Sequence, residues 1–207
     1  MTEPGAPRLA PRPREAWGDD VHGALAAAFS EAVADGFCST APDAPPVPNV
    51  VSTLMHHPGL AGPFLVYNRE LLQAPAIGHR ARELMILRVA WRTRARYEGL
   101  QHVRLAARFG VTTEEITAIG SDACAGHGWA PLEADLLTAT DQLIDGYRVD
   151  DATWARLAQR LDARQLVELV FVVGTYTGLA MAFNSFGLQP EAELLAGAAP
   201  IPPEFEE

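Results

Sequence analysis

Three ionisable residues stand among apolar ones at helical spacing, and their types suit proton transfer. Glu98 and His102 lie four residues apart in a segment whose pattern predicts a helix, and both fall on its apolar side. Glu83 falls on the apolar side of the preceding helical segment in the same way. Burial raises the pKa of a carboxyl group and a neighbouring imidazolium lowers it, so these groups are candidates for general acid–base catalysis.

The same residues also allow a structural interpretation. Glu98 and His102 could form a satisfied pair along one helix, and Glu83 could bind an arginine such as Arg88 or Arg94. The number of ionisable residues on apolar faces suggests chemistry, but the pattern of residue types leaves both interpretations open.

The overall composition is that of an ordinary globular protein and excludes several kinds of partner. Of the 207 residues, 48% are hydrophobic and 20% are charged, and the formal net charge is -10. An acidic surface repels phosphate backbones and anionic lipids, so we expect neither nucleic acid nor a membrane as a partner. Cys38 and Cys124 alone make neither a disulfide framework nor a four-ligand zinc site, and the N-terminus lacks the apolar core of a signal peptide. We therefore expect a cytoplasmic protein with no metal site.

Helical periodicity runs through most of the chain, and no segment alternates convincingly as a β-strand does. The prolines before residue 49 predict an N-terminal arm over residues 1–48, with one short helix between Trp17 and Ala34. Thr112 followed by Glu115 is a capping-box signal for a helix that begins at residue 113. We predict an all-α bundle of about six to nine helices, with a helical domain over 49–190 and a C-terminal tail over 191–207. Helices after the arm are expected at 60–72, 78–94, 96–109, 113–119, about 131–145, about 151–161 and 163–186.

The segment from 163 to 186 is apolar almost all round, which predicts burial within the domain or between subunits. Glu168 and the polar residues near Gly174 interrupt the run, so its clean apolar length is too short for a membrane span. Gly174, Gly178 and Ala182 share one face. Another helix could approach closely there, either from the same chain or from another subunit.

One stretch of the sequence resembles a known family. Residues 80–116, RARELMILRVAWRTRARYEGLQHVRLAARFGVTTEEI, are similar to the core motif of the alkylhydroperoxidase/carboxymuconolactone decarboxylase family. The segments LMHHPGLAGPF at 54–64 and LLTATDQL at 136–143 resemble the family less specifically. The resemblance implies the helical fold of that family and assembly into a homo-oligomer.

The redox branch of the family carries a glutamate, a Cys-x-x-Cys pair and then a histidine, and this sequence departs from that pattern. Matched position by position, the glutamate falls on Glu83 and the histidine on His102, but the two cysteine positions hold Ala95 and Glu98. A thiolate is needed to attack a peroxide or to exchange a disulfide. Peroxidase activity is therefore not expected here, and Cys124 has no partner at the spacing of the motif.

What remains resembles the decarboxylase branch, in which a tyrosine-glutamate pair precedes the histidine, as Tyr97 and Glu98 precede His102 here. The resemblance implies an enzyme that uses no cofactor and acts on a small carboxylated lactone. We expect His102 to be the general acid, Glu98 to hold its tautomer or share its proton, and Glu83 to orient substrate or balance charge. Decarboxylation, isomerisation, lactone opening and cyclisation stay open, because each moves protons next to a carbonyl.

The remaining expectations concern substrate binding and the alternative functions. An arginine would bind a substrate carboxylate through paired hydrogen bonds. The first alternative to an enzyme is a non-catalytic ligand-binding or scaffold oligomer of the same fold, and the second is a thiol-dependent peroxidase. The residues expected to bind substrate are Tyr97, His57 and one of Arg80, Arg82 or Arg88.

Overall fold

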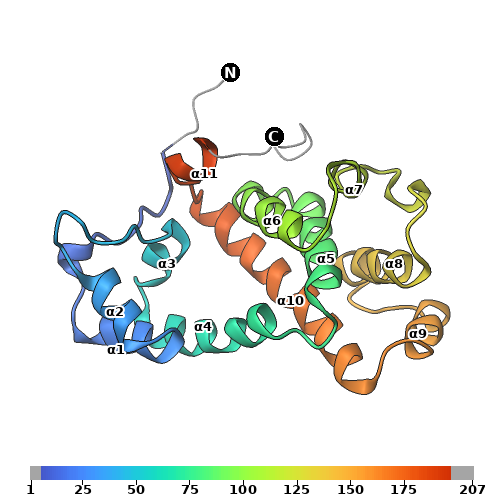
Figure 1. Cartoon of the computed structure of the whole chain (residues 1–207), viewed down its shortest axis with the longest axis horizontal. Coiled ribbons are helices and arrows are strands. Elements are labelled where there is room, and N and C mark those ends of the chain that lie inside the picture. Colours follow the sequence, from blue (N-terminus) through green and yellow to red (C-terminus); the bar gives the residue numbers. More distant parts are fainter. Residues whose placement is uncertain (1–5, 197–207) are drawn as a thin grey trace. The chain divides into compact units, whose positions relative to one another are not determined.

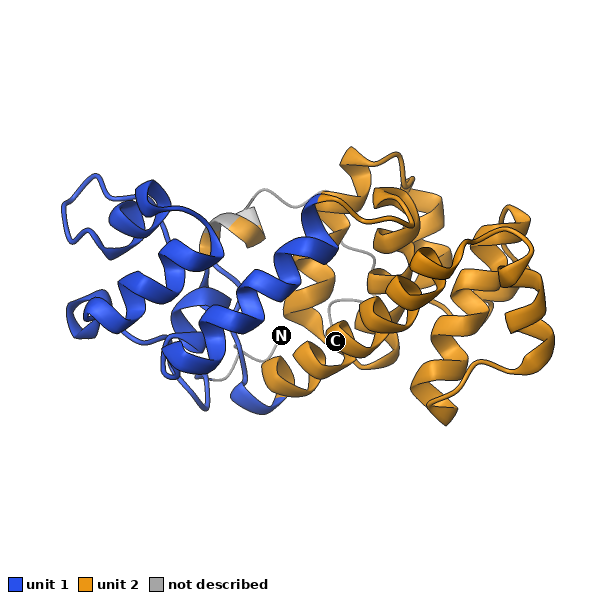
Figure 2. Cartoon of the chain, turned by 90° about the horizontal axis from the view of Figure 1, so that it is seen from below, with its two compact units in different colours: residues 1–73, 185–191 blue, residues 74–184, 192–207 orange. Residues whose placement is uncertain are grey.

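The computed structural model describes residues 6–196, and these residues form two compact units (Figure 2). Within the described residues, unit 1 comprises 6–73 and 185–191, and unit 2 comprises 74–184 and 192–196. Every regular element in this part of the chain is a helix, which confirms the all-α prediction (Figure 1). The predicted arm, domain and tail have different boundaries from these units, and that division stays a prediction. Most of the predicted tail, from residue 197 onward, lies outside the described residues.

Unit 1 is built from short helices around a small apolar core. Its elements are η1 (Arg14–Ala16), α1 (Asp19–Ala28), α2 (Glu31–Cys38), α3 (Asn49–Leu54) and α4 (Pro58–Gln73). The prediction of one helix from Trp17 to Ala34 is wrong, because Ser30 interrupts it and caps α2 by accepting a hydrogen bond from the Val33 N–H. α1 packs against α4 at Gly62, where a Cβ atom would lie 3.2 Å from the Ala24 Cβ.

Unit 2 is organised around α5, which packs against α6, α7 and α8 (Figure 1). The boundaries of α6 to α10 lie within about three residues of those expected from periodicity and capping signals. Residues 6–196 nevertheless contain more helices than predicted, because the arm holds two and the short helices α3 and α11 carry too few residues to show a period. The elements of this part are α5 (His79–Arg92), α6 (Arg96–Arg108), α7 (Thr113–Ile119), η2 (Cys124–Gly126), α8 (Pro131–Gly146), α9 (Asp151–Ala158), α10 (Ala163–Phe186) and α11 (Ala192–Ala196).

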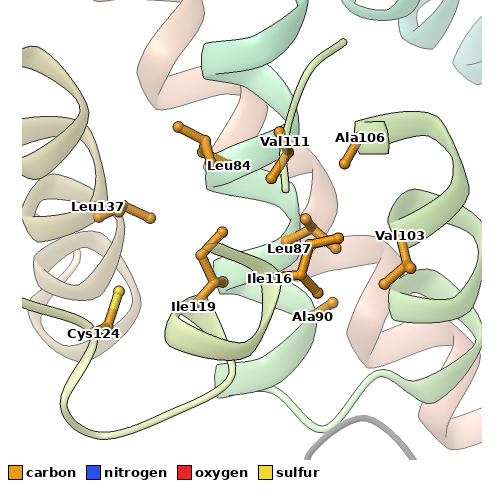
Figure 3. Packing of buried hydrophobic residues seen from close by; sticks show 10 residues of the cluster. All are labelled: Leu84, Leu87, Ala90, Val103, Ala106, Val111, Ile116, Ile119, Cys124 and Leu137. Carbon is orange, nitrogen blue, oxygen red and sulfur yellow. The ribbon is translucent and has the colours of Figure 1, made fainter. Parts of the chain in front are cut away.

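The core of unit 2 surrounds one side of α5 (Figure 3). Residues 82–90 of α5 are all buried, including three that carry charges. Its apolar side chains meet those of α6, α7, α8 and η2, with Trp91 and Trp129 packed against the edge. This packing fixes the rotation of α5 and therefore the direction of its buried polar side chains. The cluster consists of Leu84, Leu87, Ala90, Val103, Ala106, Val111, Ile116, Ile119, Cys124 and Leu137.

The entry to α5 is fixed by a carboxylate from α10. Glu168 accepts hydrogen bonds from the backbone N–H groups of Ala76 and Ile77, each at 2.9 Å. Gly78, with a φ of 89°, then turns the chain into α5. The glutamate that interrupts the apolar pattern of α10 therefore connects this helix to the start of α5.

Within the described chain α10 is buried on one side only, so of the two predicted kinds of burial, within the domain or between subunits, the second stays a prediction for its other side. Leu169, Val172 and Tyr176 are buried, whereas Phe171 and Met181 remain 54% and 63% exposed. A Cβ added at the predicted close-approach positions Gly174 and Gly178 would meet nothing within 4 Å in the described chain. Contact of this face with another subunit stays a prediction. By length and composition, α10 is the one described helix that meets the criteria for a membrane span, although such criteria are also met by core helices of soluble proteins.

We expect the predicted capping box to stabilise α7 measurably. The Thr112 hydroxyl accepts from the Glu115 N–H at 3.2 Å, and the Glu115 carboxylate accepts from the Thr112 N–H at 2.8 Å. Thr112→Ala should lower the free energy of unfolding by about 1 kcal/mol, because one N–H at the helix start loses its acceptor. Urea denaturation followed by circular dichroism measures the change. The control is Thr113→Ala, which changes an exposed neighbouring residue and should lower the free energy of unfolding by less than about 0.5 kcal/mol. Equal losses in the two variants would contradict the capping role of Thr112.

Candidate active site

A tight connection between α5 and α6 brings their buried polar residues together. The chain leaves α5 at Thr93, passes through Arg94 in the left-handed region (φ 54°) and enters α6 after Ala95. The Ala95 N–H donates to the carbonyl of Ala90 at 2.8 Å, and the Asn184 amide donates to the carbonyl of Thr93 at 2.8 Å. The chain reverses direction over these few residues, so the middle of α6 packs against the first half of α5.

At this contact, Glu83 from α5 forms a buried pair with His102 from α6. The Glu83 side chain is fully buried, and its Oε2 lies 2.7 Å from the His102 Nδ1. The other carboxylate oxygen, Oε1, accepts from the Arg82 Nε at 3.0 Å and also pairs with a terminal nitrogen of that guanidinium. Arg82 is itself buried, and its Nη1 lies 3.0 Å from the His79 Nδ1. Both oxygens of Glu83 are thus engaged by cationic or proton-bearing groups.

These partners keep Glu83 ionised despite its burial. Burial by itself raises the pKa of Glu83, but His102 and the Arg82 guanidinium together lower it below the ordinary value of 4.5. An ionised carboxylate can only accept hydrogen bonds, so the hydrogen in the contact with His102 sits on Nδ1. Nε2 is then the ring nitrogen that can exchange a proton with a substrate.

The expected pair between Glu98 and His102 does not form. The two residues are one turn apart on α6, and both are buried, as their position on the apolar side of the helix predicted. The His102 imidazole, however, points toward Glu83 and not toward Glu98. A charged carboxylate with its own guanidinium partner is the stronger hydrogen-bond acceptor for Nδ1–H. The role of holding the tautomer therefore belongs to Glu83 and not to Glu98. Glu83 does bind an arginine, as one interpretation of the sequence allowed, but the arginine is Arg82 and not the suggested Arg88 or Arg94.

Glu98 is the one carboxyl group among the described residues that is buried with both oxygens unpartnered. Its exposed fraction is 2%, and neither Oε1 nor Oε2 has a hydrogen-bond partner within residues 6–196. Burial, with no offsetting charge or donor, raises the pKa of Glu98 well above the ordinary value of 4.5. The site thus holds two buried glutamates whose environments push their pKa values in opposite directions, an arrangement typical of acid–base sites.

Aromatic rings enclose this group of polar side chains. The Tyr176 ring of α10 packs edge-on against His102 with ring centroids 5.0 Å apart, and Tyr97 packs edge-on against Phe183 at 5.4 Å. Burial first, and then the nearby carboxyl groups of Glu98 and Glu83, raise the pKa of the Tyr176 phenol. Sequence reasoning missed Tyr176, and its only signal was a hydroxyl-bearing residue within the apolar run of α10.

Of the arginines expected to bind a substrate carboxylate, Arg82 lies in this cluster and the other two are engaged elsewhere. Arg88 donates to both carboxylate oxygens of Asp141 at 2.8 Å and to two backbone carbonyls, so its donors are used within the protein. Arg80 bridges Glu115 at 2.5 Å and Glu133 at 2.8 Å. Arg80 and Arg88 are thus each paired with carboxylates of the protein itself, and substrate binding by either stays a prediction.

The other two predicted substrate-binding residues, Tyr97 and His57, belong to different units of the chain. Tyr97 lies on α6, is buried, and its hydroxyl accepts from the Gln101 amide at 3.3 Å. His57 belongs to unit 1, where its Nδ1 accepts from the Leu60 N–H at 3.2 Å. A role for His57 in binding substrate stays a prediction.

The positions that hold cysteines in the redox branch hold no thiol here. Ala95 is buried before the first turn of α6, and Glu98 occupies the second position. Cys38 and Cys124 are both free, and burial followed by a nearby aspartate raises the pKa of Cys38. Burial also raises the pKa of Cys124. Within residues 6–196, no three histidine, cysteine, aspartate or glutamate side chains gather as a metal site would require.

The fold and this site define a protein of the alkylhydroperoxidase-like helical class that has a buried Glu–His pair and no cysteine at the two motif positions. The family model for the carboxymuconolactone decarboxylase family matches residues 58–142, which contain that pair. Over residues 58–142 this match confirms the resemblance to the carboxymuconolactone decarboxylase family that was seen in the sequence. No protein of curated function matches the chain significantly.

Several solved structures share the fold at low sequence identity. An uncharacterised peroxidase-related protein with an alkylhydroperoxidase core, from Ralstonia eutropha JMP134, has a TM-score of 0.70 at 17% identity and covers 92% of this chain and 95% of its own. A peroxidase-related protein from Silicibacter sp. TM1040 has a TM-score of 0.70 at 14% identity, with 94% and 97% covered. A cysteine-to-alanine variant of the debrominase Bmp8 in complex with 2,3,4-tribromopyrrole has a TM-score of 0.64 at 15% identity, with 91% and 94% covered.

The raised pKa of Glu98 should appear as a pH-dependent loss of stability. In the folded state the group keeps its proton above pH 4.5, whereas in the unfolded state it ionises near that pH. The folded state then binds more protons, so this group lowers the free energy of unfolding as pH rises from 4.5 to the raised pKa. Glu98→Gln removes the titration and should become more stable relative to the wild type over that interval.

Urea denaturation of both proteins between about pH 4 and 8 measures the difference. The matched control is Glu114→Gln, which removes one carboxylate from an exposed position on α7. A difference between wild type and Glu98→Gln that does not change with pH would contradict the assignment of a protonated Glu98.

Thiol-dependent peroxidase activity should be no greater in the wild type than in a cysteine-free variant. Both thiols have raised pKa values, so little reactive thiolate forms near neutral pH, and neither lies at a motif position. We expect equal rates of peroxide consumption with dithiothreitol for the wild type and the Cys38→Ser/Cys124→Ser double variant. A rate that falls in the double variant would assign redox chemistry to these cysteines.

Proposed function

We propose that the protein is a cofactor-independent lyase or isomerase that moves protons next to the carbonyl of a small carbonyl or lactone acid. The single observation that carries the proposal is the 2.7 Å contact between the ionised Glu83 and the His102 Nδ1. A carboxylate at this nitrogen fixes the tautomer, stabilises the imidazolium when it forms, and presents Nε2 for proton transfer.

The two reaction types use the same histidine in different protonation states. In a decarboxylation, the bond from carbon to the carboxylate breaks and its electron pair enters the adjacent carbonyl to form an enolate. The protonated His102 then delivers its Nε2 proton to carbon, and solvent returns a proton to the ring. In an isomerisation, neutral His102 takes a proton from the carbon next to the carbonyl and returns it to a different atom of the same molecule.

The comparisons support an enzyme without identifying the reaction. The family is named after a decarboxylase, and one protein with this fold, Bmp8, is a debrominase whose structure contains a small brominated pyrrole. The cysteine-free arrangement of Glu83, Glu98 and His102 favours proton transfer over thiol chemistry. The buried aromatic surroundings of His102 favour a small organic substrate. The same apolar surroundings strengthen the electrostatic interactions between the charged groups of the site and such a substrate.

Replacement of the histidine tests the proposal directly. β-Keto acids and unsaturated lactone acids are screened for carbon dioxide release and for ultraviolet change with the wild type. His102→Ala should lower kcat/KM by about 10²–10⁴, the usual contribution of a general acid or base. Circular dichroism verifies that the variant is folded.

Two further variants make the result specific. His127→Ala changes an exposed histidine and should keep wild-type turnover, whereas Glu83→Gln should lower kcat because it removes the charge that stabilises the imidazolium. Turnover that survives in a folded His102→Ala protein would move the chemistry elsewhere. Saturable binding of a probe without turnover would favour the non-catalytic ligand-binding protein.

A further inference from the structure

The two buried glutamates of the site differ in one respect, which is whether the protein supplies their partners. Glu83 has Arg82 on one oxygen and His102 on the other. Glu98 is buried to the same degree, yet neither of its oxygens has a hydrogen-bond partner within residues 6–196. Buried polar groups are nearly always satisfied, so an orphaned carboxyl beside a candidate proton carrier requires an explanation.

Glu98 lies on the same helix as His102, the proton carrier of the proposed function. The two residues are one helical turn apart on the same buried stripe of α6. Tyr176 packs edge-on against His102, and its phenol is close enough to the Glu98 carboxyl to interact with it electrostatically. Glu98, His102 and Tyr176 therefore belong to one local group of side chains. Within this group, the carboxyl of Glu98 can still form hydrogen bonds with a ligand.

The protonation state determines the chemistry of that partner. A carboxyl group without a counter-charge in an apolar site keeps its proton, because the ionised form loses its hydration and gains nothing in return. A protonated carboxyl donates through its O–H, and the carbonyl oxygen of an uncharged ligand can accept this hydrogen bond.

Charged ligands fit this position less well. A carboxylate would need a cation at the site, but the guanidinium of the buried Arg82 is already paired with Glu83. An ammonium group would require Glu98 to ionise, and two ions would then lose their hydration in a position that is 2% exposed.

We propose that Glu98 is a hydrogen-bond donor for the uncharged carbonyl oxygen of a ligand, so that a ketone, aldehyde or lactone carbonyl occupies this position and a carboxylate or ammonium group does not. The inference rests on the proposed function, because it names the group that meets the substrate oxygen while His102 moves the proton. Any carboxylate of the substrate is bound away from Glu98.

Three ring compounds of matched size test the ligand class by binding alone. The probes are 2-cyclohexen-1-one, 1-cyclohexene-1-carboxylate and cyclohexylammonium, titrated into the full-length protein at neutral pH and followed by chemical-shift changes. The ketone should bind more tightly than either ion. Tighter binding of the carboxylate or the ammonium ion, or no binding of the ketone up to its solubility limit, would overturn the proposal, and the last result would mean that water alone satisfies Glu98.

Two substitutions at the same position separate hydrogen bonding from packing. Glu98→Gln keeps a neutral donor of the same shape and should retain the affinity for the ketone. Glu98→Leu keeps the size but has no donor, and should weaken this affinity by about tenfold, as expected for the loss of one hydrogen bond. Equal weakening in both folded variants would show a packing role and contradict the proposal.

Infrared spectroscopy then reports the protonation state without a ligand. The carbonyl stretch of a protonated carboxyl should be present in the wild type and in the surface control Glu114→Gln, and absent from Glu98→Gln. Absence of this band from the wild type at neutral pH would overturn the proposal. Ketone binding without turnover would contradict the proposed function alone, whereas turnover unaffected by Glu98→Leu would contradict this inference alone.

Discussion

The pairing of Glu83 with Arg82 and His102 is the interaction on which the rest of the site depends. An uncompensated charge at a fully buried position would be too costly for a marginally stable domain. Here the guanidinium and the imidazole satisfy one carboxylate oxygen each, so the charge is retained inside the core. Retention of the charge in turn decides which ring nitrogen of His102 carries hydrogen. The electrostatics of one residue of α5 thus determine the chemistry available to a residue of α6.

The same site shows why two residues of one type need not have one role. Glu83 and Glu98 are both buried, but one has partners supplied by the protein and the other has none among the described residues. Hydrogen-bond partners lower the pKa of Glu83 and so favour its ionised form, whereas burial raises the pKa of Glu98 and favours its protonated form. At the motif position where the redox branch of the family has a thiol, this chain therefore has a carboxyl group. Under the proposed function, that exchange replaces a nucleophile with a hydrogen-bond donor while the helical scaffold stays the same.

Much of the fold could be predicted from the sequence, because helical periodicity and caps are local signals. The capping box at Thr112 and Glu115 placed the start of α7 correctly. The burial of Glu83, Glu98 and His102 followed from their position on apolar stripes. The pairing of Glu83 with His102 could not be predicted in this way. An apolar stripe along a helix identifies neighbours on that helix and gives no information about residues of the neighbouring helix. Arg88 illustrates the same limit, because its partner Asp141 lies 53 residues away.

The hydrogen bonds that join α10 to the backbone just before α5 limit where residues can be inserted into or deleted from the chain. Glu168 holds the backbone at Ala76 and Ile77, and Glu83 follows a short distance later on a continuous helix. One residue added within α5, between His79 and Glu83, would rotate the carboxylate by about 100° relative to that fixed point. Insertions and deletions in this segment would therefore separate the Glu–His pair even if every helix survived, whereas a change of length in the loop before α8 would leave the pair in register.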